Sequence, residues 1–132
     1  MTRSFVPALA LLALGTAHAG GVNHIVTVAP NALSFSPPVT NASIGDTVTF
    51  NKAAGSLFHN VASDAGAPQT FRCAQGCDGA GGDGGATNAA WSATISITAS
   101  GTIGYHCEIH GQGMTGSIVV GTPVGLQNFE ID

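Results

Sequence analysis

The chain has 132 residues, of which 3 are basic and 7 acidic, and charged side chains make up 8% of it, against roughly 25% in an ordinary soluble domain. Its basic residues are Arg3, Lys52 and Arg72, too few for the positive surface of a nucleic-acid-binding protein. A hydrophobic content of 44% with a net charge of −4 also excludes a disordered chain. The composition therefore indicates a folded domain, and 19 glycines with 6 prolines favour a fold rich in turns and strands.

The first 19 residues have the three parts of a secretory signal peptide. Arg3 provides a positive charge, residues 5–14 are apolar, and Ala17-His18-Ala19 is a small-x-small cleavage site. We expect cleavage after Ala19, which would leave residues 20–132 as one mature domain, periplasmic or secreted. No apolar run reaches the roughly 20 residues of a membrane-spanning helix, so no membrane span is expected.

Residue patterns in the mature part predict short strands separated by turns. Alternation is clearest between Trp91 and Thr98, where apolar residues occupy one face and Ser or Thr the other. Further strands are predicted at residues 22–28, 46–51, 57–62, 101–107 and 115–120, between clusters of Gly, Pro, Asn and Asp. This succession predicts an all-β fold, a Greek-key β-sandwich or barrel.

The segment from Cys73 to Thr87 is rich in glycine and is predicted to be a long loop. Three cysteines in an exported protein are an odd number, so at least one is unpaired, intermolecular or a metal ligand. Cys73 and Cys77 lie four positions apart in a Gly-containing turn, which permits a local disulfide. Two thiols at this spacing would also suit Cu(I), and Cys107 could instead be bridged to one of them.

The string from Tyr105 to Met114, YHCEIHGQGM, brings together a thiol, an imidazole and a thioether in Cys107, His110 and Met114. These soft ligands favour copper over cations that prefer oxygen. Alternation along the preceding strand points Cys107 inward and His106 outward. The same reasoning places His59 on the inward face of its segment, so a second imidazole is available. Two His, one Cys and a weak axial Met form the ligand set of a blue-copper site.

This pattern resembles the cupredoxin family, which includes plastocyanin, pseudoazurin and amicyanin. The resemblance also rests on Asn60 after His59, on the segment from Ile44 to Phe50 and on the GSIVV run after Met114. The resemblance extends from about Val22 to Val120. It implies a Greek-key sandwich with one type 1 copper ion, bound by His59, Cys107, His110 and axial Met114. The chain departs from those relatives in having three residues between His110 and Met114, where plastocyanins and pseudoazurins have four and amicyanins two.

The resemblance also implies a non-enzymatic one-electron carrier that works with redox protein partners, and we expect a monomer. Asn60 is the candidate for a supporting residue, its backbone N–H donating to the Cys107 sulfur. An apolar patch around His110 is expected from Phe58, Ile109, Gly113 and Met114. Other charged or ionisable residues are expected to be structural or solvated, namely His24, His106, Asp64, Asp78, Asp83 and Glu108.

Four alternatives remain open at this point. The first is copper handling, with Cys73 and Cys77 as additional Cu(I) ligands for delivery. A copper enzyme is disfavoured because substrate chemistry needs an open coordination position or a second metal. Zinc is disfavoured because a thioether is a poor zinc ligand. The last alternative is a sandwich without metal.

Overall fold

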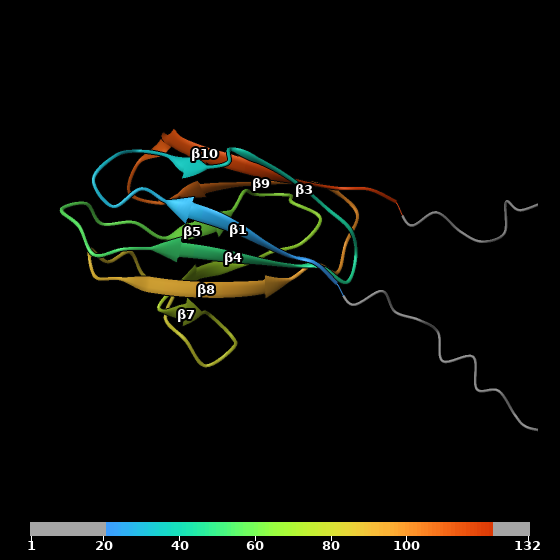
Figure 1. Cartoon of the computed structure of the whole chain (residues 1–132), viewed down its shortest axis with the longest axis horizontal. Coiled ribbons are helices and arrows are strands. Elements are labelled where there is room, and N and C mark those ends of the chain that lie inside the picture. Colours follow the sequence, from blue (N-terminus) through green and yellow to red (C-terminus); the bar gives the residue numbers. More distant parts are fainter. Residues whose placement is uncertain (1–20, 123–132) are drawn as a thin grey trace, which may run out of the picture.

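The computed structural model describes residues 21–122. Within them lie ten strands and no helix, arranged as two packed sheets (Figure 1), so the predicted all-β sandwich is confirmed. No helix in this range has the length and apolarity needed to cross a bilayer. The predicted signal peptide, residues 1–19, lies outside the described residues.

The first sheet has the strand order β2-β1-β4-β8 and the second the order β3-β10-β9-β5-β6-β7. Two neighbouring pairs, β1–β4 and β3–β10, are parallel, and the others are antiparallel. The bounds are β1 Asn23–Val28, β2 Phe35–Ser36, β3 Val39–Ala42, β4 Thr47–Lys52, β5 Val61–Ser63, β6 Arg72–Ala74, β7 Gly76–Cys77, β8 Trp91–Ser96, β9 Gly101–Cys107 and β10 Gly111–Val120.

The core lies between the inner faces of the sheets, where alternating residues are buried. In β8 the alternation is complete: Trp91, Ala93 and Ile95 are buried and the residues between them are exposed, as predicted. Tyr105 of β9 packs against Phe35 and Phe50 with ring centroids 4.9 and 5.2 Å away, both edge to face. These contacts join the two sheets, because β9 belongs to the second sheet and Phe35 and Phe50 belong to strands of the first.

The turn between β2 and β3 contains Pro37 and Pro38 and carries the chain from one sheet to the other. The two short strands on either side of it were not predicted. Because a proline has no backbone N–H to give to a ladder, the strand pattern is interrupted there.

The predicted strand at 57–62 begins later than expected, at Val61. Before it, Leu57 donates its backbone N–H to the Pro30 carbonyl oxygen at 3.2 Å, and His59 exchanges backbone hydrogen bonds with Thr87. The segment therefore bonds to two loops instead of to a sheet neighbour. Its inward side chain is nevertheless placed as the alternation predicted, because His59 is fully buried.

The predicted loop from Cys73 to Thr87 begins with a small hairpin formed by β6 and β7. Cys73 pairs with Cys77 and Ala74 with Gly76 across the turn. Gly76 has φ of +83°, a region that only glycine adopts freely. In Figure 1, β7 and the loop after it project below β8.

Candidate metal centre

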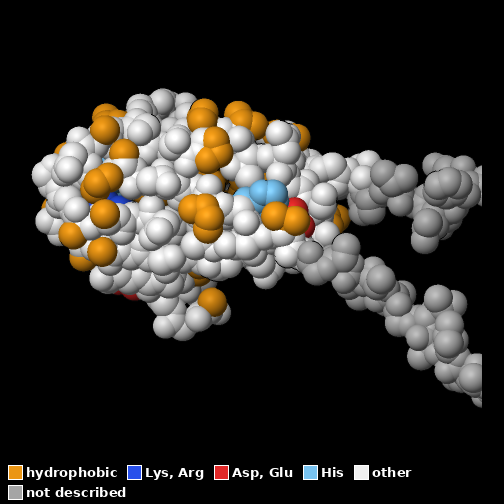
Figure 2. All heavy atoms as spheres, in the orientation of Figure 1, with side chains coloured by type: hydrophobic (Ala, Val, Ile, Leu, Met, Phe, Trp, Pro, Cys, Tyr) orange, Lys and Arg blue, Asp and Glu red, His pale blue; other side chains and the backbone are white. Residues whose placement is uncertain are grey.

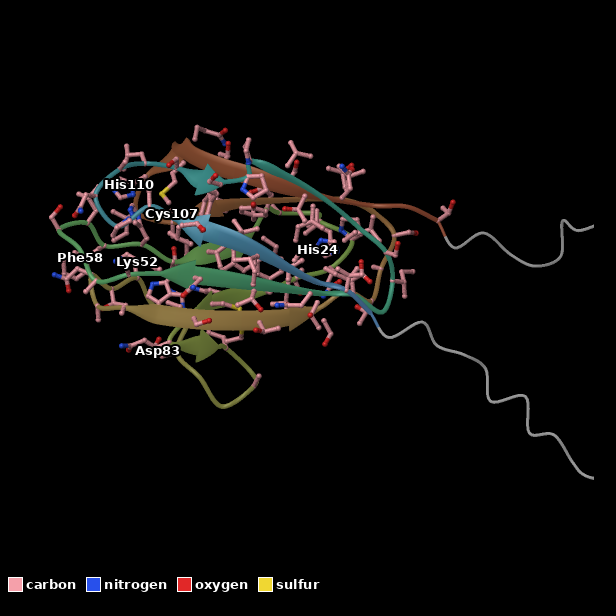
Figure 3. The ribbon with its side chains drawn as sticks, viewed as in Figure 1. His24, Lys52, Phe58, Asp83, Cys107 and His110 are labelled. Carbon is pink, nitrogen blue, oxygen red and sulfur yellow. A yellow bond between two sulfur atoms is a disulfide. The ribbon has the colours of Figure 1, made fainter. Side chains whose placement is uncertain are left out.

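Two segments that are distant in the sequence, the loop that carries His59 and the end of β9 with the turn after it, meet at one end of the sandwich. His59 lies in the loop before β5, Cys107 ends β9, and His110 ends the turn that follows β9. Figure 3 shows Cys107 and His110 at the same end of the molecule as Phe58, with His24 toward the other end. The predicted residues His59, Cys107 and His110 are therefore brought together by the fold.

One thiol and two imidazoles converge on a shielded point. The candidate donor atoms of His59, Cys107 and His110 all lie within 4.8 Å of one another. The Cys107 Sγ is 3.6 Å from the His59 Nδ1, and the two imidazole centroids are 4.9 Å apart. His59 and Cys107 are fully buried, whereas His110 is half-buried. This donor set suits a single copper or zinc ion.

Hydrogen bonding and burial prepare both imidazoles to bind a metal. The His59 Nε2 lies 3.0 Å from the Ala32 carbonyl oxygen, so Nε2 carries the proton and the Nδ1 lone pair faces Cys107. Burial lowers the pKa of His59, and the nearby His110 lowers it further, which favours the neutral ring. The His110 Nδ1 is buried without a hydrogen-bond partner. Such an orphaned nitrogen calls for an explanation, and a bound metal ion provides one.

Met114 lies in an irregular part of β10. Gly111 and Thr115 pair with adjacent residues of β9, Cys107 and His106, so the residues between Gly111 and Thr115 have no partner in this ladder. Met114 is 1% exposed and belongs to the same buried cluster as Cys107. The thioether is thus buried beside the ligand-bearing end of β9, while its axial coordination stays a prediction.

Asn60 joins the loop of His59 to the turn after Cys107. Its Oδ1 accepts a hydrogen bond from the Glu108 backbone N–H at 2.9 Å, and its Nδ2 donates to the Glu108 carboxylate and the Gly84 carbonyl oxygen. Asn60 is fully buried. Sequence reasoning missed this link because Glu108 was expected to be solvated. The hydrogen bond expected from the Asn60 backbone to the Cys107 sulfur stays a prediction.

Charged groups near the site are paired, although the sequence suggested solvated charges. Arg72 donates to Asp78 at 2.9 Å and to Glu108 at 2.6 Å. His106 points away from the core, as predicted, and its Nδ1 lies 2.6 Å from Asp64. Arg72, the first residue of β6, therefore links the Asn60–Glu108 contact to the base of the hairpin formed by β6 and β7.

The pairing of the three cysteines agrees with the pairing that their spacing suggested. Cys73 and Cys77 form a disulfide, and Cys107 is free and buried. The predicted bridge is confirmed, and the alternative that bridges Cys107 is wrong. The disulfide also occupies both sulfurs on which the copper-delivery alternative depends, so this structure offers no thiol pair there.

An exposed apolar surface surrounds this end of the molecule. Phe58 is 48% exposed, Ile109 56% and Leu33 46%, and we call these three residues the apolar rim. Figure 2 shows hydrophobic side chains gathered at the end where Figure 3 labels Phe58. Met114 was expected to contribute to this surface, which is wrong because it is buried. Leu33 was missed, since one Leu in a polar loop carries no signal of its own.

Comparison with known proteins agrees with this geometry. The family model described as copper-binding proteins of the plastocyanin/azurin family matches residues 22–121. A pseudoazurin structure from Sinorhizobium meliltoi is 32% identical, with a TM-score of 0.52 over 80% of this chain and 78% of that one. An amicyanin variant in a reduced Cu(I) form is 24% identical, with a TM-score of 0.55 over 75% and 82%, and supports the fold. No curated protein sequence matches the chain.

Proposed function

The chain belongs to the plastocyanin/azurin family of copper-binding proteins, and from this premise we propose that it carries single electrons between redox proteins. Copper is the metal of this family, and the donor set fits it. The proposed ligands are the His59 Nδ1, the Cys107 Sγ, the His110 Nδ1 and the Met114 thioether. When bound, copper supplies a one-electron couple between Cu(II) and Cu(I). The observation that carries the proposal is the convergence of three buried donor atoms within 4.8 Å.

The surroundings of the site suit electron transfer better than catalysis. The proposed ligand set fills the coordination sphere from the protein, and substrate chemistry would need an open position. The His59 ring is held by Ala32, and Asn60 ties its loop to the turn after Cys107. Ligands held by the fold move little when the charge of the site changes, which is what rapid exchange of one electron requires.

His110 is the proposed exit for the electron. It is the half-buried member of the donor set, and the apolar rim is exposed at the same end of the sandwich. A partner protein that covers this surface would approach the site through His110. Because the chain has 8% charged residues, we expect docking to depend on apolar contact more than on long-range steering. We further propose that the protein acts as a monomer, either periplasmic or secreted, after removal of residues 1–19.

The test is reconstitution of the reduced apo-protein with Cu(II). We expect an intense visible thiolate-to-copper band and reversible loss and recovery of that band on addition and removal of one electron. Cys107→Ser should abolish the band. A Cys73→Ser/Cys77→Ser double variant is the matched control and should keep it. A band that survives in Cys107→Ser would contradict the proposal.

A further inference from the structure

Lys52 is a buried cation that has no carboxylate partner among the described residues. It ends β4 and is 1% exposed, although lysine is among the residues that are least often fully buried. Its Nζ donates to the carbonyl oxygens of Ala53 and Asn88, each at 3.1 Å, and of Ala89 at 3.4 Å. None of the ion pairs found among residues 21–122 includes Lys52. Carbonyl dipoles therefore surround this charge, and no acidic group within the described part of the chain pairs with it.

Hydrogen bonds connect the residues around the Lys52 charge to His59. Lys52 pairs with Trp91 across β4 and β8, and the Trp91 Nε1 donates to the His59 carbonyl oxygen at 3.2 Å. Asn88, which accepts from the ammonium group, follows Thr87. Thr87 in turn exchanges backbone hydrogen bonds of 3.1 and 3.2 Å with His59. Figure 3 labels Lys52 at the same end of the sandwich as Cys107 and His110.

We propose that the buried ammonium group of Lys52 favours the Cu(I) state of the site and so raises its reduction potential. This inference rests on the proposed copper site. Reduction lowers the charge at the metal by one, so a fixed positive charge nearby destabilises Cu(II) more than Cu(I). The interaction is stronger than it would be across the same distance in water, because the effective dielectric constant inside a protein is lower. It is also poorly screened by salt, because the charge is buried.

The surroundings of the Nζ support a charged lysine. Burial lowers the pKa of Lys52 from its ordinary value, while the carbonyl oxygens that accept from the Nζ stabilise the ammonium form. The positive charge of Lys52 also acts on His59. Burial is the main cause that lowers the pKa of His59, the nearby His110 lowers it further, and Lys52 adds to this effect. Lys52 is thus a tuning residue whose ammonium group donates to backbone carbonyl oxygens and to no proposed metal ligand.

The experiment compares the reduction potentials of copper-loaded wild type, Lys52→Gln and Lys52→Met by spectroelectrochemistry of the full chain. Gln keeps a donor for the carbonyl oxygens, Met keeps the apolar stem, and both remove the charge. We expect a several-fold lower Cu(I)/Cu(II) ratio at a fixed applied potential in both variants. The shift should persist at high salt, and the visible band should keep its position. The Lys52→Arg variant retains the charge and should keep the ratio near that of wild type.

Two further measurements keep the inference testable if the neutral variants do not fold. Nitrogen-15 NMR of wild-type Cu(I) protein should show a Lys52 ammonium group at pH 7, and a neutral amine would overturn the inference. Potentials that are equal in wild type and in folded Gln and Met variants would also overturn it, while leaving the carrier function intact. Failure of the wild type to form the visible band would overturn the proposed function itself.

Discussion

The Sγ of Cys107 lies 3.6 Å from the Nδ1 of His59, although 48 positions separate the two residues in the chain. His59 is placed by backbone bonds to Thr87, and Cys107 by the ladder between β9 and β10. The site therefore exists only in the folded protein, which couples metal binding to stability.

Copper should raise the melting temperature, because it binds a site that the unfolded chain lacks. At 100 times the dissociation constant the gain in unfolding free energy is about 2.7 kcal/mol, or roughly 10 °C or more for a domain of this size. Differential scanning calorimetry of the apo and copper-loaded forms measures it. The Cys107→Ser variant is the control and should gain less, and equal melting of wild type with and without copper would argue against a preformed site.

Met114→Leu should keep copper bound and raise the reduction potential. The exchange preserves volume in the buried cluster and should cost less than about 1.5 kcal/mol of stability. It removes a weak axial donor that stabilises Cu(II), so the Cu(I)/Cu(II) ratio at a fixed applied potential should rise. Redox titration monitored through the visible band gives the result. An unchanged potential would show that Met114 is not the axial ligand.

Asn60→Ala should destabilise the protein and disturb the spectrum of the site. Truncation leaves the partly buried Glu108 N–H and the buried Gly84 carbonyl oxygen without their partner, at a cost of about 1–3 kcal/mol. Loosening the join between the His59 loop and the end of β9 should also shift or broaden the visible band. Chemical denaturation and absorption spectra measure the two effects.

Glu108→Gln is the matched comparison for that variant. It keeps an acceptor for Asn60 and loses the charge that faces Arg72. Because exposed ion pairs contribute at most about 1 kcal/mol, its stability and band should stay close to those of wild type. If Glu108→Gln lost more stability than Asn60→Ala, the ion pair between Arg72 and Glu108 would contribute more to stability than the hydrogen bonds of Asn60.

Local sequence patterns could predict the parts of the fold and site in which the type and position of a residue indicate whether it is buried or binds a metal. Alternation gave the buried faces of β8 and β9 correctly, and with them the inward Cys107. The inward position of His59 followed from the same rule, although the segment bonds to loops. Cys107, His110 and Met114 were identifiable because soft donors at this spacing are uncommon without a metal.

The missed features depend on partners that are far away in the chain. Asn60 and Glu108 are in contact although 48 positions separate them in the sequence, and no local sequence pattern predicts such a contact. Lys52 was counted as one of three scattered basic residues, because the carbonyl oxygens of Asn88 and Ala89 that allow its burial come from the loop before β8. Leu33 became part of the apolar rim only through the packing of its loop beside His59.

The Cys73–Cys77 disulfide should support stability and leave the metal site unchanged. By the loop-entropy relation a bridge that closes about five residues contributes roughly 2 kcal/mol. The Cys73→Ser/Cys77→Ser variant should therefore lose about that much in guanidinium denaturation and keep its visible band. Thiol titration of unfolded, unreduced wild-type apo-protein should find one free thiol. Three free thiols, with additional Cu(I) bound by wild type and lost in the double variant, would restore the copper-delivery function.

Asp46 should stabilise the protein at neutral pH and cease to do so in acid. Its carboxylate lies 2.8 Å from the His24 Nε2 and accepts backbone N–H bonds from Ser43 and Val22, both at 2.9 Å. The hydrogen bond with His24 is the largest cause that lowers the pKa of Asp46, followed by those from Ser43 and Val22.

Because the pKa is lower in the folded state than the value of about 3.9 in the unfolded chain, the stabilisation is fully present above that value. It is lost as the pH falls through the folded pKa. Asp46→Asn should thus melt below wild type at pH 7, and the difference should shrink as the pH falls below about 4. Melting curves of the apo-proteins between these conditions measure the trend without interference from the metal. His24→Gln, which leaves the backbone bonds to Asp46 in place, should show a smaller effect with the same sign. If the difference in melting temperature between wild type and Asp46→Asn stayed constant as the pH fell, Asp46 would act through packing instead of through its charge.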